Sequence, residues 1–239
     1  MTLEARRRSP VMIPPAVRYA LWCTAFLLSL SVTRAMPWTI TGAVRHATEH
    51  TAISNAVVWA EPVGTMPVFP APAQPAEMAQ VHLAFVPRVL PVLVGTTVVF
   101  PNRDTVYHSV FSLTRHQRFE IGLYPHGESR SVTLDKPGLV KVFCSIHDQM
   151  FGAILVLPTR YFSISTAQGT FTLSHVPPGD YTVQIWHERL HGDSQSVRVA
   201  DRGTTTIPLM LEIDLAPPDL SLYPDDMSQN DPLPEETTS

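Results

Sequence analysis

Three side chains that can bind a soft metal ion lie close together in the stretch Val142–Gly152. Cys144 supplies a thiolate, His147 an imidazole and Met150 a thioether, all on one short segment between two apolar runs. Sulfur and imidazole ligands suit copper better than they suit cations that prefer oxygen. The stretch therefore predicts either a metal-binding loop between two strands or an ordinary hairpin.

A fourth ligand is expected from a neighbouring loop at the same end of the fold. A copper electron-transfer site uses two imidazoles and a thiolate in a trigonal plane, with a weak thioether on the axis. His108 offers the second imidazole, because it follows the turn Asn102–Thr105 and stands at the start of a predicted strand. Three predicted strands fill the gap between His108 and Cys144, which is enough to carry the chain away from that end and back.

The elements that must position these residues are β-strands. Short runs of Val, Ile, Thr and aromatic residues recur along the chain, punctuated by Pro, Gly, Asn and Asp. The 23 prolines argue against long helices. Closely spaced short strands predict a two-sheet sandwich or a Greek-key barrel. The strands expected around the candidate ligands are Val81–Val86, Val89–Val94, Thr96–Phe100, Ser109–Leu113, Phe119–Leu123, Arg130–Leu134, Leu139–Phe143 and Gly152–Leu157.

Further strands are expected on both sides of this region. Thr39–Arg45 and Asn55–Glu61 precede a proline-rich loop and are assigned with the ligand-bearing strands to one domain at residues 36–158. A smaller β-sandwich is expected at residues 159–215. Its expected strands are Tyr161–Ile164, Gly169–Leu173, Asp180–His187, Ser194–Ala200 and Thr204–Met210.

The N-terminus has the pattern of an export signal. Arg6–Arg8 precede the apolar segment Ala20–Val32, and Thr33–Ala35 offers small residues for cleavage. We expect a signal peptide at residues 1–35, cleaved after Ala35, and a mature protein in the periplasm without stable membrane insertion. The apolar segment is shorter than the roughly 20 residues of a membrane span, so a retained N-terminal anchor is the alternative.

Cysteine usage and charge narrow the possible functions. Cys23 would leave with the signal, so Cys144 could form no disulfide within the mature chain and would be either metal-bound or a buried core residue. Residues 216–239 are acidic and rich in proline, which predicts a disordered tail. No basic patch supports nucleic-acid binding.

The ligand pattern resembles the cupredoxins, or blue copper proteins. It combines Pro101–Asp104 followed by His108, the turn Asp135–Gly138, and the spacing of Cys144–Met150, which is similar to that of amicyanin. The resemblance covers about Thr39–Leu157. It implies a Greek-key β-sandwich with one type 1 copper ion, whose ligands would be His108, Cys144, His147 and Met150. It also implies that the outer edge of His147 is the electron port. Candidates for the apolar shell that keeps water off the sulfur are Val106, Phe143, Phe151 and Ile154.

Two further resemblances concern the rest of the chain. The segment Pro177–Tyr181 and its surroundings resemble carboxypeptidase-regulatory, or transthyretin-like, modules, which implies a small β-sandwich for the second domain. The whole chain resembles exported bacterial proteins labelled methylamine utilisation proteins. One departure concerns Ser109, because several cupredoxins have Asn immediately after the first histidine. How the cysteine loop is tied to that strand is therefore open.

The expected function is one-electron transfer between periplasmic redox partners, a donor and an acceptor, without bond-making catalysis. A periplasmic copper-binding or partner-binding protein without electron-transfer turnover is the alternative of another class. Zinc also accepts one Cys and two His, although a thioether is a poor zinc ligand. A nucleophilic pair of Cys144 and His147 is a further alternative, but three residues apart on a tight turn they would share a metal more easily than align for proton transfer.

Overall fold

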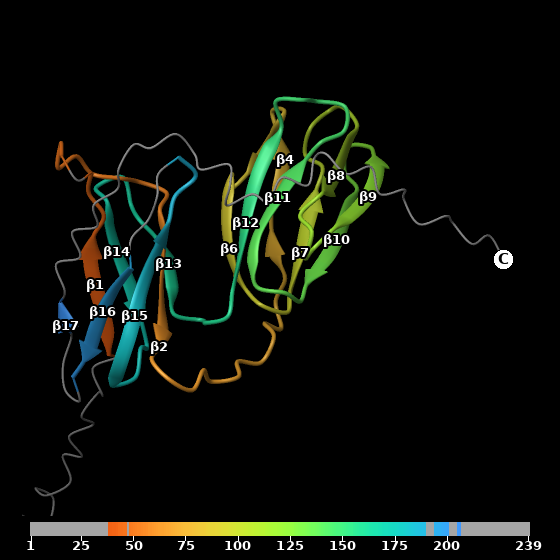
Figure 1. Cartoon of the computed structure of the whole chain (residues 1–239). Helices are drawn as coiled ribbons and strands as arrows, with labels where there is room; N and C mark the ends of the chain where they lie inside the picture. The colour runs from red at the N-terminus through yellow and green to blue at the C-terminus, as the bar shows by residue number, and fades with distance from the viewer. Residues whose placement is uncertain (1–37, 47, 190–193, 201–204, 207–239) are drawn as a thin grey trace, which may run out of the picture. The chain divides into compact units, whose positions relative to one another are not determined.

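The computed structural model describes residues 38–46, 48–189, 194–200 and 205–206, and within these ranges every regular element is a β-strand (Figure 1). The expected signal peptide at residues 1–35 and the expected tail at residues 216–239 lie outside the described residues, as does most of the strand expected at Thr204–Met210. In the described ranges, we find no helix with the length and apolar character needed to cross a membrane.

One β-sandwich carries all of the candidate ligands. Its larger sheet has the strand order β6-β12-β11-β8-β9, and its smaller sheet has the order β10-β7-β3. The strands of the larger sheet are β6 (Val89–Leu93), β12 (Phe151–Leu157), β11 (Gly138–Phe143), β8 (His108–Ser112) and β9 (Phe119–Tyr124). Those of the smaller sheet are β10 (Ser129–Leu134), β7 (Thr96–Pro101) and β3 (Ala76–Glu77).

Alternation along the strands builds the core of this sandwich. Successive side chains of a strand point to opposite faces, and in β7 every second residue, beginning with Thr96, is buried. Val98 and Phe100 of this strand meet Val140 and Val142 of β11 in one apolar cluster. Strand β12 is buried at every position but its first, because Leu155 and Leu157 belong to another apolar cluster that includes Val57 of β2.

The hairpin beside this sandwich differs from the sequence expectation. Val81–Val86 was expected as one strand, whereas the chain forms β4 (Ala79–Val81) and β5 (Ala84–Val86), which pair antiparallel. His82 and Leu83 make the turn with φ values of 51° and 57°. Positive φ at both central residues is the geometry of tight hairpin turns, which usually contain Asn or Gly. Neither residue is present here, so the turn carries no sequence signal.

A second set of sheets contains strands from both ends of the described chain. Its sheets have the orders β14-β1-β17 and β13-β2-β15-β16. The strands are β1 (Thr39–Ala43), β2 (Val57–Pro62), β13 (Phe162–Ile164), β14 (Thr170–Ser174), β15 (Gly179–Trp186), β16 (Ser194–Val199) and β17 (Thr205–Thr206). Figure 1 shows β1 and β2 among these later strands. The fold class is therefore confirmed as all-β, with the ligand-bearing sandwich and a second, smaller β-sandwich.

The pairing of β1 and β2 departs from the expected division at residue 158. Strand β1 pairs with β14, and β2 pairs with β13 and β15, so neither strand belongs to the sheets that carry the candidate ligands. The apolar run of β2 predicts a buried strand correctly, but an apolar run does not specify which sheet buries it. The proline-rich segment at residues 63–75 consequently connects two sandwiches and is not an excursion within one.

Candidate metal centre

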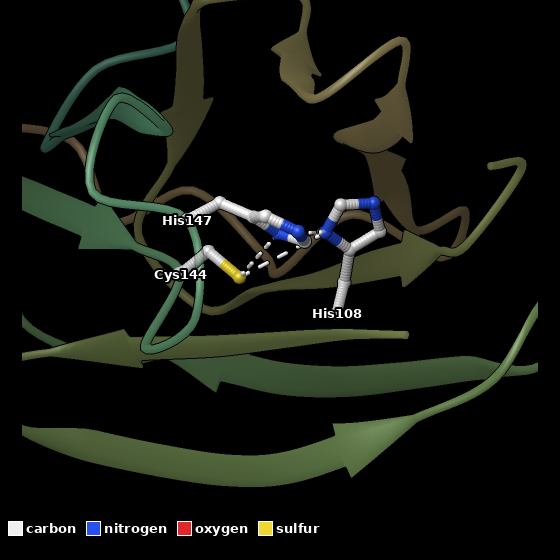
Figure 2. Close-up of side chains that lie close together, drawn as sticks. All are labelled: His108, Cys144 and His147. Carbon is white, nitrogen blue, oxygen red and sulfur yellow. Dashed lines mark hydrogen bonds between the residues drawn. The ribbon is translucent and has the colours of Figure 1, made fainter. Parts of the chain in front are cut away.

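His108, Cys144 and His147 come together at one end of the ligand-bearing sandwich (Figure 2). His108 is the first residue of β8, and Cys144 follows the last residue of β11. His147 lies on the turn that leads into β12. The Cys144 Sγ atom is 3.8 Å from His108 Nδ1 and 3.6 Å from His147 Nδ1. The two Nδ1 atoms are 3.2 Å apart.

These three distances fit a shared metal ion. A triangle with edges of 3.2, 3.6 and 3.8 Å has a centre equidistant from its corners at about 2.1 Å, which is the length of a metal–imidazole bond. One thiolate sulfur and two imidazole nitrogens form a donor set that copper and zinc both accept. The three donor atoms therefore lie close enough together to share one such ion.

Burial differs sharply among the three residues. His108 has no exposed surface, and Cys144, a free cysteine, is 4% exposed. His147 is only half-buried. The site is therefore closed to water on the side of His108 and Cys144, and the imidazole of His147 is its contact with the surface.

Met150 lies at the end of the same turn. It is 1% exposed and belongs to the same apolar cluster as Cys144. Its backbone amide donates a hydrogen bond to the carbonyl of His147 at 2.9 Å, which closes the turn. The structure thus brings three of the four expected ligands into one group and places the fourth, Met150, buried directly before β12.

Ser109 ties the cysteine turn to β8. Its Oγ atom accepts a hydrogen bond from the backbone amide of Ser145 at 2.8 Å and lies 2.7 Å from the Ser145 hydroxyl. The backbone amide of Ser109 points at Cys144 Sγ from 3.5 Å. A serine therefore makes the connection that the sequence left open.

Asp104 holds the far side of the His108 ring. Its Oδ2 atom is 2.8 Å from His108 Nε2 and also accepts the backbone amide of Leu83 at 2.8 Å, while Oδ1 accepts the amide of His82. Burial alone would raise the pKa of Asp104, but these hydrogen bonds outweigh burial and leave the pKa below its ordinary value. In the sequence, Asp104 stands out only as part of a turn. Its position four residues before His108 was the available signal.

The apolar surroundings differ from those expected. Val106, Phe143, Phe151 and Ile154 were expected to shield the sulfur, but only Ile154 lies in the cluster that contains Cys144. Val106 is 42% exposed. The rings of Phe143 and Phe151 are in tilted contact, with centroids 5.5 Å apart, and Phe151 packs against the cluster that includes Val57 of β2. Phe143 precedes Cys144 directly, so strand alternation turns it to the opposite face of the sheet.

Comparisons with known proteins give partial similarities. A family model described as polysaccharide lyase family 4, domain II, matches residues 159–207. A search of the curated proteins finds no significant match. The solved structures include a copper-containing nitrite reductase from Thermus scotoductus SA-01, at 32% identity over 41% of this chain and with a TM-score of 0.34. The match spans only 25% of that reductase.

Two smaller copper proteins are also similar. The purple cupredoxin of Nitrosopumilus maritimus is 24% identical over 34% of this chain and 99% of its own, with a TM-score of 0.32. An oxidized amicyanin variant is 21% identical over 35% of this chain and 82% of its own, with a TM-score of 0.33. The solved structures that resemble this chain thus include cupredoxins. The resemblance of the whole chain to methylamine utilisation proteins stays a prediction.

Proposed function

We propose that this protein is a type 1 copper protein that carries single electrons between redox partners. The observation that supports the proposal most directly is the convergence of the Sγ atom of Cys144 and the Nδ1 atoms of His108 and His147. The Nε2 atom of His108 is already engaged by Asp104, so the Nδ1 lone pair is the one left for a metal. A buried thiolate beside two imidazoles is a donor set suited to copper.

The proposal gives each residue a definite role. Cys144 would bind as the thiolate, His108 and His147 as neutral imidazoles, and Met150 as a weak axial thioether. A bound copper ion supplies a one-electron redox couple. The protein contributes the frame, because His108 begins strand β8, Cys144 directly follows β11, and a serine holds the turn between β11 and β12. The half-buried His147 ring offers the surface through which a partner would be reached.

The cellular setting belongs to the same proposal. The export pattern at residues 1–35 supports a periplasmic location, where a redox donor and an acceptor would meet the mature protein. In this setting the protein acts as a carrier without bond-making catalysis. A methylamine-oxidising enzyme is one candidate donor, supported only by the resemblance of the whole chain.

Metal content and the visible spectrum of the mature protein test the proposal. We expect the copper-loaded protein to contain one copper ion per chain and to absorb strongly in the visible, because a thiolate–copper(II) bond gives such absorption. The band should disappear on reduction, return on reoxidation and be absent in Cys144→Ser. A copper-loaded protein without colour would contradict electron transfer and favour simple copper binding. Purification with stoichiometric zinc and no uptake of copper would reject copper as the metal.

A further inference from the structure

The carboxylate of Asp104 accepts hydrogen bonds from three donors on two separate segments. The backbone amides of His82 and Leu83 come from the turn between β4 and β5, and Nε2 comes from His108 on β8. The Asp104 side chain is 9% exposed and that of His108 is fully buried. Water has little access to this contact.

The backbone around Asp104 leaves it little freedom to turn away. Its own amide donates to the side-chain Oδ1 of Asn102 at 3.0 Å. The side-chain amide of Asn102 donates in turn to the carbonyls of Val106 and Tyr124. Because each end of Asp104 is held by a different partner, the carboxylate keeps a fixed place behind the imidazole.

The chemistry of the two groups fixes the proton between them. A carboxylate can only accept hydrogen bonds, and a neutral imidazole carries one N–H and one lone pair. With Nε2–H directed at Asp104, the lone pair of His108 lies on Nδ1. That atom faces Cys144 Sγ and His147 Nδ1, at 3.8 and 3.2 Å. The tautomer that binds a metal is thus selected before any metal arrives.

We propose that Asp104 is a positioning residue for the metal centre: it holds His108 in the Nε2–H tautomer and, through its negative charge, favours bound Cu(II) over Cu(I). The second part rests on the proposed function. A carboxylate on the outer nitrogen makes a ligating imidazole a stronger donor, and a buried negative charge near the ion stabilises the more positive oxidation state. The same contact therefore orients the ligand and lowers the reduction potential.

The first test needs no copper. Nitrogen-15 NMR of the metal-free mature protein reports which imidazole nitrogen of His108 carries the proton. We expect Nε2–H in the wild type and a weaker preference in Asp104→Asn, because an asparagine oxygen and amide group cannot accept from all three donors. A wild-type protein with the proton of His108 on Nδ1 would overturn the proposal, and this measurement decides even if the variant does not fold.

The second test uses the copper-loaded protein. In Asp104→Asn, we expect the affinity for Cu(II) relative to Cu(I) to fall about tenfold, the lower end of the usual effect of such partners, which raises the one-electron potential by about 59 mV. Asp148→Asn is the matched control, because it removes the same charge from an exposed residue of the cysteine turn. Solvent screening should leave it with a much smaller shift.

The outcomes separate the two proposals. An unchanged potential in Asp104→Asn, or an equal shift in Asp148→Asn, would overturn the role of the Asp104 charge. A colourless copper-loaded wild type would instead contradict the electron-carrier function, and the prediction about the reduction potential would fall with it. The Nε2–H tautomer of His108 in the metal-free protein would still support Asp104 as the residue that orients the ring.

Discussion

Tyr124 shows how single residues fix the core beside the candidate metal centre. It has no exposed surface, although its side chain ends in a polar hydroxyl. That hydroxyl donates to the carbonyl of Phe100 at 3.0 Å and accepts a hydrogen bond from the buried side chain of Gln80. The backbone carbonyl of Tyr124 also accepts from Asn102, which in turn supports Asp104. The phenol therefore joins strand β9 to strands β7 and β4.

Replacing Tyr124 with phenylalanine should destabilise the protein by about 1–3 kcal/mol, because Gln80 and Phe100 would each lose a buried hydrogen-bond partner. Tyr107→Phe is the matched control, since Tyr107 is 58% exposed and surface changes of this kind usually stay within about 0.5 kcal/mol. Urea unfolding of both variants at neutral pH measures the difference. Equal effects would show that the buried hydrogen bonds of Tyr124 contribute nothing specific.

The same residue gives a pH dependence of known sign. Burial raises the pKa of Tyr124 to about 12 from an ordinary value of 10.0. The unfolded chain would therefore release this proton at lower pH than the folded chain, so stability falls as pH rises from 10 to about 12. Tyr124→Phe lacks this pH-dependent loss. We therefore expect the difference in free energy of unfolding between the variant and the wild type to shrink over that range. A difference in free energy of unfolding that stays constant across this pH range, measured by urea unfolding, would contradict the raised pKa of Tyr124.

At the residue scale, types and spacing predicted which side chains come together, and contacts between distant segments could not be predicted. His108, Cys144 and His147 converge as expected because each stands at a strand end or on the turn between strands. The hydrogen bonds that hold the Asp104 carboxylate come in part from the hairpin turn at His82, more than 20 positions earlier. No local pattern indicates that this turn presents its amides to a carboxylate.

At the scale of elements, β8 and the turn after β11 form the frame of the site. Strands β8 and β11 pair directly only at Phe111 and Phe143. Beyond that pair, the polar contacts of Ser109 with Cys144 and Ser145 continue the connection toward the ligands. The position of the Cys144 side chain relative to His108 therefore depends strongly on one serine side chain.

Ser109→Ala should loosen the cysteine turn while leaving the sandwich folded. The Ser145 amide would lose its acceptor, and we expect its hydrogen exchange to accelerate about tenfold, which corresponds to the net worth of one hydrogen bond. Exchange measured by NMR in the metal-free protein reports this without reference to copper. Ser131→Ala, at an exposed position of β10, should leave the rate unchanged. Unaltered protection of Ser145 in Ser109→Ala would show that another contact holds the turn.

Most strands could be predicted because their residues alternate or form short apolar runs between turn residues. Strand β8 begins and ends one residue earlier than expected, which moves His108 onto the strand, and β12 begins one residue earlier. The hairpin at His82 could not be predicted, since its turn conformation is stabilised by contacts with Asp104 and not by Gly or Asn. Strand pairing was the least predictable feature, because periodicity shows which face is buried but not the partner.

At the scale of the whole chain, strands near the two ends of the described region complete the same sheets. Ile40 of β1 and Val57 and Val58 of β2 have no exposed surface. Both strands pair with strands that follow the entire ligand-bearing sandwich in sequence, with Thr39 opposite Ser174 and Val57 opposite Trp186. The second sandwich consequently cannot be completed before the chain has passed through the first.

This arrangement predicts that the chain survives a cut between β2 and β3. A specific protease site inserted after Gly64 would lie in an exposed segment, where Val63 and Val68 are 62% and 96% exposed. After cleavage, we expect the piece with β1 and β2 to remain bound, because it keeps its backbone hydrogen bonds to β13, β14 and β15 and its buried apolar side chains. Size-exclusion chromatography in native buffer should show one complex that separates only in concentrated urea. Release of the N-terminal piece in native buffer would mean that these pairings do not hold the two ends of the chain together.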